Sequence, residues 1–279
     1  MEDAIIIGKG IFGVAIATAL KNTGRKVLVL DNHESLAGSP PSGGHMKPSW
    51  FSGLGKSVYD PGLETLETLF GFTEEKYSIY PLPKGISVSV FRVDIDKALQ
   101  FDHVVAEVTE IGLLATREPE VVYMSKGKEV RVRCKLLVVA AGIWCRKLLP
   151  GLFPKNDLVG KTGVSFRFTG QVTPFIKPWA PYRQIVAHNI NSDLVWVGDG
   201  TAILEKNWTE DRVSQCESRC KSAIRINAEP TKRILGIRPY YAKNKFCVER
   251  IGNAAWVATG AGKHGTVVAG YAAQLIARS

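Results

Sequence analysis

Residues 4–13 of the chain, AIIIGKGIFG, decide its fold class. The first four of them are an apolar run typical of a buried strand, and the apolar stretch 14–20 that follows has helical character. A second β-type apolar run, 26–30, comes after this helix. Two neighbouring parallel strands need such a helical crossover. Residues 4–30 therefore predict a β-α-β unit within an α/β domain.

The glycines of this unit have the spacing GxGxxG. Gly8 is expected to make the tight turn, Gly10 to let the backbone approach a pyrophosphate, and Gly13 to let helix and strand pack closely. The N-terminus of the helix presents unpaired N–H groups to phosphates. Asp31, 18 positions after Gly13, can accept hydrogen bonds from ribose hydroxyls and would repel a 2′-phosphate. The unit predicts a dinucleotide site that disfavours NADP; the alternative is that the glycines serve packing alone.

The rest of the chain contains two kinds of strand pattern. Buried runs of the parallel type occur at 136–140 and 255–258, and alternating patterns occur at 86–91 and within 161–200. Helical patterns occupy 63–72 and 211–226. The interleaving predicts a Rossmann-like cofactor domain with an inserted mixed antiparallel-sheet substrate domain. We expect the cofactor domain to comprise residues 1–80, 93–157 and 236–279, and the substrate domain to comprise 81–92 and 158–235.

Composition narrows the class of protein. At 45% hydrophobic and 22% charged residues the chain can bury a core, and no apolar run reaches 18 residues. No basic leader precedes the first apolar run, so we expect a cytoplasmic protein. The five cysteines form no CxxC pair, which argues against a disulfide framework. Cys216 and Cys220 share a helix face without further metal ligands, so packing is favoured over a metal site.

Charge is distributed unevenly along the chain. The whole sequence has a net charge of +10, made up of −1 over residues 1–100 and +11 over residues 101–279. The excess is scattered, apart from the basic residues within 126–135. A solvated surface is one interpretation, and attraction of an anionic partner, most plausibly nucleic acid, is the other.

Three further stretches have the character of flavin-contacting loops: 42–46 (SGGHM), 139–144 (VAAGIW) and 258–266 (ATGAGKHGT). A domain that binds only NAD does not need a second glycine-rich loop opening a helix near the end of the chain. Such a loop suits a flavin that lies extended across the domain, with its ring oxygens met by a helix N-terminus. These stretches favour FAD over NAD.

With these loops, the fingerprint at 8–13 and Gly236-Ile237-Arg238-Pro239, the chain resembles the family of D-amino-acid oxidase, glycine oxidase and sarcosine oxidase. The motifs follow the family's order from end to end, although the chain is shorter than most members. The resemblance implies a Rossmann-like FAD-binding domain. The cysteine that bonds flavin in sarcosine oxidases has no clear counterpart, because Cys247 lies beyond the expected place, so FAD is expected to be non-covalent.

The resemblance also implies roles for individual residues. Arg238 is expected to grip a substrate carboxylate, for which a permanently charged, planar guanidinium is suited. Lys263 is a second basic residue near flavin and carboxylate, and His45 lies next to the ring. Tyr182 and Gln184 are expected in the substrate pocket. The alternatives are a structural arginine, an exposed lysine and a hydrogen-bonded loop histidine.

The predicted cofactor contacts combine the fingerprint, the loops and the resemblance, which places the backbone of Val105 at the adenine. They are Gly8, Gly10, Ile11, Phe12, Gly13, Asp31, Asn32, Ser42, Gly43, Gly44, His45, Met46, Val105, Ala141, Gly142, Trp144, Gly262, Lys263, His264, Gly265 and Thr266.

The resemblance implies oxidation of the C–N bond alpha to a carboxylate in a glycine-like amino acid or N-substituted glycine. The α-hydrogen passes to the flavin as hydride, the imine hydrolyses, and oxygen is the expected electron acceptor. The amine is either free or, as in some relatives, attached to a nucleobase in DNA or RNA, which the positive charge of 101–279 would attract. Two alternatives are a dehydrogenase or imine reductase with another electron acceptor, and a non-catalytic FAD-binding subunit of a larger amine dehydrogenase.

Overall fold

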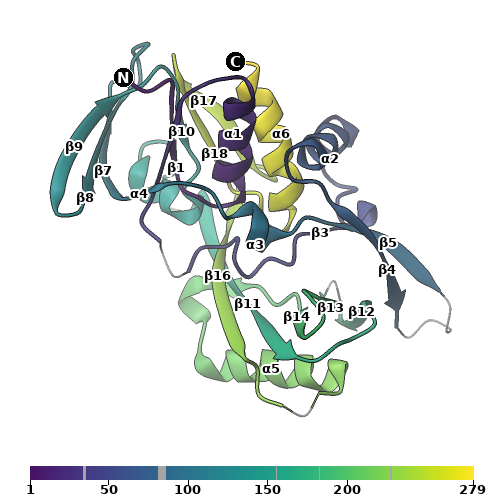
Figure 1. Ribbon diagram of the computed structural model, residues 1–279. Coiled ribbons are helices and arrows are strands. Elements are labelled where there is room, and N and C mark those ends of the chain that lie inside the picture. The colour runs from purple at the N-terminus through teal and green to yellow at the C-terminus, as the bar shows by residue number, and fades with distance from the viewer. Residues whose placement is uncertain (34–35, 81–85, 155, 182, 227) are drawn as a thin grey trace.

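The computed structural model describes residues 1–33, 36–80, 86–154, 156–181, 183–226 and 228–279, and Figure 1 shows their arrangement. The first sheet has six strands in the order β17-β18-β10-β1-β2-β6, parallel except for β17. Its strands are β1 (Ala4–Ile7), β2 (Val27–Asp31), β6 (Val104–Val105), β10 (Leu137–Val139), β17 (Cys247–Gly252) and β18 (Ala255–Thr259). The central strands β1 and β10 are buried throughout, as their continuous apolar sequences predict.

The predicted β-α-β unit is present, with helix α1 (Ile11–Asn22) between β1 and β2. Gly8 has a φ of +103°, which favours glycine, and a Cβ there would press on the backbone of Ala140. A Cβ at Gly13 would overlap the carbonyl oxygen of Gly8. The close packing expected at Gly13 is therefore confirmed by the structure.

Two further helices lie beside α1, first α6 and then α2 (Figure 1). Helix α6 (Gly265–Ala277) contacts both α1 and α2 (Lys56–Phe70). The helices α2 and α6 cross closely at Gly62 and Gly270. A Cβ at Gly270 would overlap the carbonyl oxygen of Gly62, so this crossing needs a glycine. Helix α2 was predicted at 63–72, too late in the chain, because it continues through Pro61, a residue that usually marks a helix start.

The second sheet has nine strands in the order β15-β11-β14-β13-β12-β4-β5-β3, with β16 paired to β11. It is mostly antiparallel, but β12 and β4 are parallel, so the sheet is mixed, as predicted. The strands are β3 (His45–Met46), β4 (Thr73–Ile79), β5 (Ser87–Arg92), β11 (Leu158–Thr169), β12 (Phe175–Ala180), β13 (Arg183–Asn189), β14 (Leu194–Gly198), β15 (Ile203–Leu204) and β16 (Lys232–Tyr241).

Helix α5 (Glu210–Ile224) covers one face of this sheet, below β11 and β16 in Figure 1. Its buried side chains include both Cys216 and Cys220, which pack in one core with Phe166 and Phe168 of β11. This packing accounts for the spacing of the two cysteines.

Strands of the second sheet cross the boundaries expected for the two domains. β16 pairs with β11 without interruption from Lys232 to Tyr241, so its register leaves no division at residue 236. β3 and β4 both pair with β5, although residues before 81 were expected in the cofactor domain. Tyr240 of β16 also forms an isolated β-bridge with Ala261, just after β18, so β16 connects the two sheets.

A third, three-stranded sheet extends to the side of the six-stranded sheet (Figure 1). Its strands are β7 (Glu107–Gly112), β8 (Glu120–Ser125) and β9 (Lys128–Arg133). The short helices are α3 (Ile95–Ala98), α4 (Cys145–Leu148) and the 3-10 turns η1 (Pro48–Trp50), η2 (Gly142–Trp144), η3 (Glu205–Asn207) and η4 (Gly262–His264). Within the part of the chain that the structure describes, no helix has both the length and the apolar character needed to cross a membrane.

Candidate active site

One cavity of about 790 Å³ is lined by residues of both large sheets. This volume is within the range of cofactor and small-molecule sites. The lining includes the carboxyl ends of β1 and β2, the N-terminus of α1, the turn η4, and strands β13, β14 and β16. The charged residues of the lining are Asp31, Glu107, Lys147, Arg238 and Lys263.

The N-termini of two helices open at the cavity. Gly10, the N-cap of α1, provides no side-chain cap, and the first turn of α1 has no acidic residue. The N–H of Ile11 donates to Oγ of Ser39 at 2.9 Å. Helix α6 likewise has no side-chain cap and no acidic residue in its first turn, and it begins beside η4. Both ends carry a partial positive charge, which favours an anionic ligand group.

Asp31 lies at the end of β2 and fixes the glycine-rich loop. Its Oδ2 accepts from the N–H of Lys9 at 2.7 Å, and its Oδ1 accepts from the N–H of His33 at 2.8 Å. Each carboxylate oxygen has a further lone pair, so the side chain can also accept from a ligand hydroxyl. Asp31 and its neighbour Asn32 both line the cavity.

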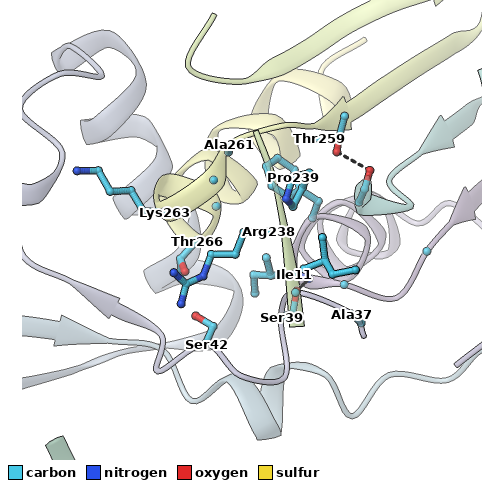
Figure 2. A pocket seen from close by; sticks show the side chains of 18 of the residues that line it. Ile11, Ala37, Ser39, Ser42, Arg238, Pro239, Thr259, Ala261, Lys263 and Thr266 are labelled. Atoms are coloured by element: carbon cyan, nitrogen blue, oxygen red, sulfur yellow. Dashed lines mark hydrogen bonds between the residues drawn. The ribbon is translucent and has the colours of Figure 1, made fainter. Parts of the chain in front are cut away.

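The cavity fits an extended dinucleotide on the evidence of its backbone. Gly10 lines it, and a Cβ there would come within 3.2 Å of Oγ of Ser39. Gly142 has a φ of +58°, and its carbonyl accepts from the hydroxyl of Thr259 at 2.8 Å, which ties η2 to the end of β18 (Figure 2). Glycine backbone and helix N-termini along one side form the cradle that phosphates and ribose require.

Arg238 is placed on β16, directly opposite Lys161 of β11, and is partly buried. Its guanidinium packs on Gly163, where a Cβ would be 3.4 Å from Cζ. Figure 2 shows the side chain extending in the direction of Ser42 and Thr266. Among the carboxylates that the structure describes, none forms an ion pair with Arg238. The cavity therefore contains a guanidinium whose charge is available to an anion.

Lys263 also lines the cavity but is exposed, and Figure 2 shows its side chain directed away from Arg238. Its neighbour His264 lies with its ring 5.6 Å from that of Phe51. Burial, with Lys263 and Lys245 nearby, lowers the pKa of His264. This imidazole is therefore neutral at physiological pH.

His45 lines the cavity from β3, and its Nε2 lies 2.9 Å from Nδ1 of His188. Burial, with Arg92 nearby, lowers the pKa of His45 to about 3. Burial also lowers the pKa of His188, and His45 and Arg92 add to the effect. The wall next to Trp196 thus carries neutral imidazoles rather than cations.

Most of the predicted site residues meet at this one cavity. Gln184 lines it from β13, whereas Tyr182 lies outside the described residues. The other predicted residues in the lining are Gly8, Gly10, Ile11, Phe12, Asp31, Asn32, Ser42, Gly43, His45, Ala141, Gly142, Trp144, Arg238, Gly262, Lys263, His264, Gly265 and Thr266.

Four predicted contacts are not in the lining. Gly13 packs against Gly8, and Gly44 has a φ of +66° where a Cβ would overlap the carbonyl oxygen of Val93. Met46 is fully buried in the core. Val105 is 56% exposed and lines a smaller neighbouring pocket with Asn32 and Glu107. Two of these residues shape the loops behind the cavity, because the same chain turns that build a site also need close backbone contacts.

The structure adds lining residues that sequence reasoning did not assign. Ser39 caps α1 from a loop 28 residues away, and Trp196, Gly198 and Gly200 come from the β13–β14 region. The segment 49–53 also lines the cavity. For this segment the sequence does hold a signal, because the cluster of His45, Met46, Trp50 and Phe51 favours an ordered loop over a site rather than a linker. The alternating pattern of β14 holds none.

The cysteines lie away from the cavity. All five are buried and free, and none of them is in its lining. Burial raises the pKa of Cys247 to about 12, so its thiol is protonated. Among the residues that the structure describes, no three His, Cys, Asp or Glu side chains gather as a metal site.

The basic cluster within 126–135 is partly neutralised. Arg131 and Arg133 both bond to Glu120, at 2.7 and 3.2 Å, and Lys135 bonds to Asp3 at 2.8 Å. These pairs offset part of the positive charge of this cluster.

Comparisons with known proteins agree with this geometry. The family described as FAD dependent oxidoreductase matches residues 103–279, and the NAD(P)-binding Rossmann-like domain matches residues 6–62. No curated protein sequence matches the chain. The predicted α/β class, with a Rossmann-like domain and a mixed sheet, is confirmed.

Several solved structures share the fold. Glycine oxidase from Bacillus cereus ATCC 14579 is 17% identical, with a TM-score of 0.74 over 99% of this chain and 94% of that chain. L-proline dehydrogenase from P. horikoshii is 16% identical, with a TM-score of 0.74 over 99% and 92%. Iminodiacetate oxidase from Chelativorans sp. BNC1 is 15% identical, with a TM-score of 0.71 over 98% and 94%. At these identities the likeness shows the fold alone.

Proposed function

Because the chain belongs to the family of FAD-dependent oxidoreductases, we propose that it oxidises the C–N bond alpha to a carboxylate in a glycine-like amino acid or N-substituted glycine. The family match spans more than half of the chain, so the enzyme class and the cofactor are those of the family. The substrate class is our inference from the cavity. It agrees with the substrates that glycine oxidase and iminodiacetate oxidase are named for.

The observation that carries the proposal is the state of Arg238. It is a partly buried guanidinium in the cavity lining, without an ion pair to any described carboxylate. A buried charge is costly unless it is paired, so this position favours a ligand that brings its own negative charge. A carboxylate matches a guanidinium with two parallel hydrogen bonds, which also fixes the orientation of the substrate.

In this proposal the residues of the cavity orient the substrate. FAD, when bound, would supply the acceptor for the hydride that leaves the α-carbon. Arg238 holds the carboxylate at one end, while the neutral wall of His45 and Gln184 leaves the amine without a competing positive charge. Holding the reacting carbon in one orientation lowers the entropic part of the barrier.

We propose that FAD is held without a covalent bond. Gly8, Gly10 and Asp31 would hold the adenosine and pyrophosphate, and Gly262–Thr266 at the N-terminus of α6 would meet the ring. No cysteine lines the cavity, which supports the non-covalent mode. In this proposal the six-stranded sheet forms the cofactor domain, and the nine-stranded sheet carries the substrate.

The test is anaerobic reduction of the FAD-loaded protein by a panel of amines: glycine, sarcosine, D-amino acids, and a glycine-bearing nucleoside and oligonucleotide. We expect the small carboxylate-bearing amines to bleach the yellow flavin. In Arg238→Leu we expect the flavin to remain bound but no longer to be bleached by these amines. Arg212→Leu, which removes the same charge from the exposed face of α5, is the matched control. Failure of every amine to bleach the flavin contradicts the proposal.

The same experiment separates the remaining alternatives. Bleaching by the oligonucleotide but not by free glycine would assign a nucleic-acid-linked amine. Steady release of peroxide in air identifies oxygen as the electron acceptor, whereas bleaching without peroxide identifies a dehydrogenase. A protein that binds FAD and reacts with no amine would be the non-catalytic subunit.

A further inference from the structure

Two histidines from distant segments meet at the wall of the cavity. His45 lies on β3 and lines the cavity; His188 lies on β13, is 3% exposed and is not in the lining. Nε2 of His45 is 2.9 Å from Nδ1 of His188, and the ring centroids are 4.7 Å apart in an edge-on arrangement. His188 therefore acts on the cavity through His45.

The ring of His45 is held on several sides. Its centroid lies 5.1 Å from that of Trp196 and 5.7 Å from that of Tyr77. A Cβ at Gly43 would overlap the ring atoms Cε1 and Nδ1, so Gly43 leaves the space that the ring fills. Because Nε2 is bonded to His188, Nδ1 is the nitrogen left for another partner, and it lies against Gly43 of the cavity lining.

Both imidazoles are neutral. Burial is the main reason for the lowered pKa of each, and the positive charge of Arg92 adds to it. Arg92 is itself paired with Glu75 at 2.7 Å. Tyr77, the other titratable group against the His45 ring, has a pKa raised by burial and stays a neutral phenol. A neutral imidazole carries one N–H and one lone pair, so in this pair one ring donates and the other accepts.

The direction of that hydrogen bond decides the chemistry at the cavity. If Nδ1 of His188 donates to Nε2 of His45, then Nδ1 of His45 carries a hydrogen and is a donor. If Nε2 of His45 donates instead, Nδ1 of His45 is an acceptor. The two arrangements differ only in the positions of hydrogens, so the heavy atoms do not need to move.

We propose that His188 is a positioning residue that sets the tautomer of His45, and so the donor or acceptor character of the nitrogen at the cavity wall. The inference rests on FAD occupying the cavity, as in the proposed function, but it does not depend on the identity of the amine. The reactive ring nitrogen of a flavin accepts hydrogen bonds when oxidised and donates when reduced. A tautomer of His45 that is set by His188 therefore favours one of these two states over the other.

Two substitutions of His188 test this role. The amide of His188→Asn offers a donor and an acceptor close to the place of Nδ1, whereas His188→Leu offers neither. We expect His188→Leu to change the ratio of the affinities for oxidised and reduced FAD by tenfold or more, which is about 30 mV in the two-electron midpoint potential. His188→Asn is expected to restore the potential. An unchanged potential in His188→Leu overturns the proposal.

A second measurement reads the tautomer directly. The chain has five histidines, so nitrogen NMR of ¹⁵N-labelled imidazoles resolves ten ring signals. His45 is expected to be neutral in a single tautomer from pH 8 to pH 5, and to lose that preference in His188→Leu. A cationic His45 at pH 6, or a tautomer that is unaffected by the substitution, contradicts the proposal. If His188→Leu does not fold, His188→Asn and the wild-type spectrum decide.

Val195→Ala is the matched control. Val195 is fully buried on β14 opposite Asn189, next to the His188–Trp196 pair, and does not contact the cavity. The Val195→Ala substitution removes packing from the same part of the sheet and is expected to leave the midpoint potential and the tautomer of His45 unchanged. A shift in potential equal to that of His188→Leu would mean that loosened packing, and not the loss of the His188 hydrogen bond, is the cause. Because neither measurement needs a substrate, failure of the amine panel and failure of this proposal remain distinguishable.

Discussion

The two walls of the cavity are built in different ways. The wall from the six-stranded sheet consists largely of backbone: glycine-rich turns, helix N-termini and one carboxylate. Each turn is a short continuous segment, although the segments come from distant parts of the chain. The wall from the nine-stranded sheet consists of side chains, such as Arg238, His45 and Trp196, which come from strands far apart in sequence.

This difference separates two kinds of dependence. A backbone wall fails when a side chain is added, because the turn no longer closes or the helix no longer approaches. A side-chain wall fails when a side chain is removed, because a buried partner is left unpaired. The following predictions test that distinction, and they are ordered from the largest expected effect to the smallest.

The largest effect is expected at Asp199, between Gly198 and Gly200 of the side-chain wall. Asp199 is fully buried and accepts from Arg219 at 2.7 Å and from the hydroxyl of Thr201 at 2.8 Å. Asp199→Ala leaves the guanidinium unpaired, so we expect a loss of about 4 kcal/mol in the free energy of unfolding, measured by denaturant titration. The exposed Asp193→Ala is the control and should cost less than about 0.5 kcal/mol.

The backbone wall is tested at Gly13. A Cβ there would overlap the carbonyl oxygen of Gly8, so Gly13→Ala is expected to lower the free energy of unfolding by about 3 kcal/mol and to reduce the FAD content of the purified protein. Thermal melting and flavin absorbance measure the two effects. Gly151→Ala, at a position with no neighbouring atom within 4 Å, should change neither. Equal flavin content in Gly13→Ala and wild type would mean that the turn tolerates the side chain.

The charge of the side-chain wall is tested at Arg238. Arg238→Leu is expected to weaken binding of a carboxylate ligand by about thirtyfold or more, which corresponds to about 2 kcal/mol. Titration of the flavin spectrum with benzoate or a similar acid measures this affinity, and the amount of bound FAD should not change. If the Arg238→Leu variant instead loses FAD and keeps its affinity for carboxylates, Arg238 serves to bind the cofactor and not the substrate.

The smallest expected effect, counted per residue and per pH unit, is the dependence of the free energy of unfolding on pH. His45 and His188 have pKa values lowered by burial, so below their ordinary value of 6.5 the unfolded chain binds protons that the folded chain does not. Their contribution to stability is present above pH 6.5 and is lost as the pH falls. The expected slope is about 1 kcal/mol per pH unit for each residue, measured by denaturant titration between pH 6.5 and 5. The double variant His45→Asn/His188→Asn should remove most of this slope.

The backbone wall was predictable because its signals are local. The spacing of Gly8, Gly10 and Gly13 predicts a tight turn and a close approach of helix and strand. The apolar runs on either side predict that strand and that helix. The same holds for the glycine-rich loop before α6. The role of Arg238 is predicted by the motif Gly236-Ile237-Arg238-Pro239 around it and not by any pattern of charge.

The side-chain wall was only partly predictable. Trp196 is one of several apolar residues in an alternating strand, and nothing in that pattern distinguishes a residue facing a cavity from one facing a core. Ser39 accepts from the N–H of Ile11, 28 residues earlier in the chain, and no local pattern predicts that contact. The pairing of β3 and β4 with β5, which brings both strands into the nine-stranded sheet, likewise depends on residues distant from each of these short segments.

By itself the sequence determined that the chain contains a β-α-β dinucleotide unit, because turn geometry and periodicity depend on residues a few positions apart. Only the tertiary structure decided that His45 meets His188, 143 residues later, and that Arg238 lies in the cavity without an ion pair to any carboxylate that the structure describes. Strand pairing sets which distant side chains share a face, and that pairing is a property of the whole sheet rather than of any one segment.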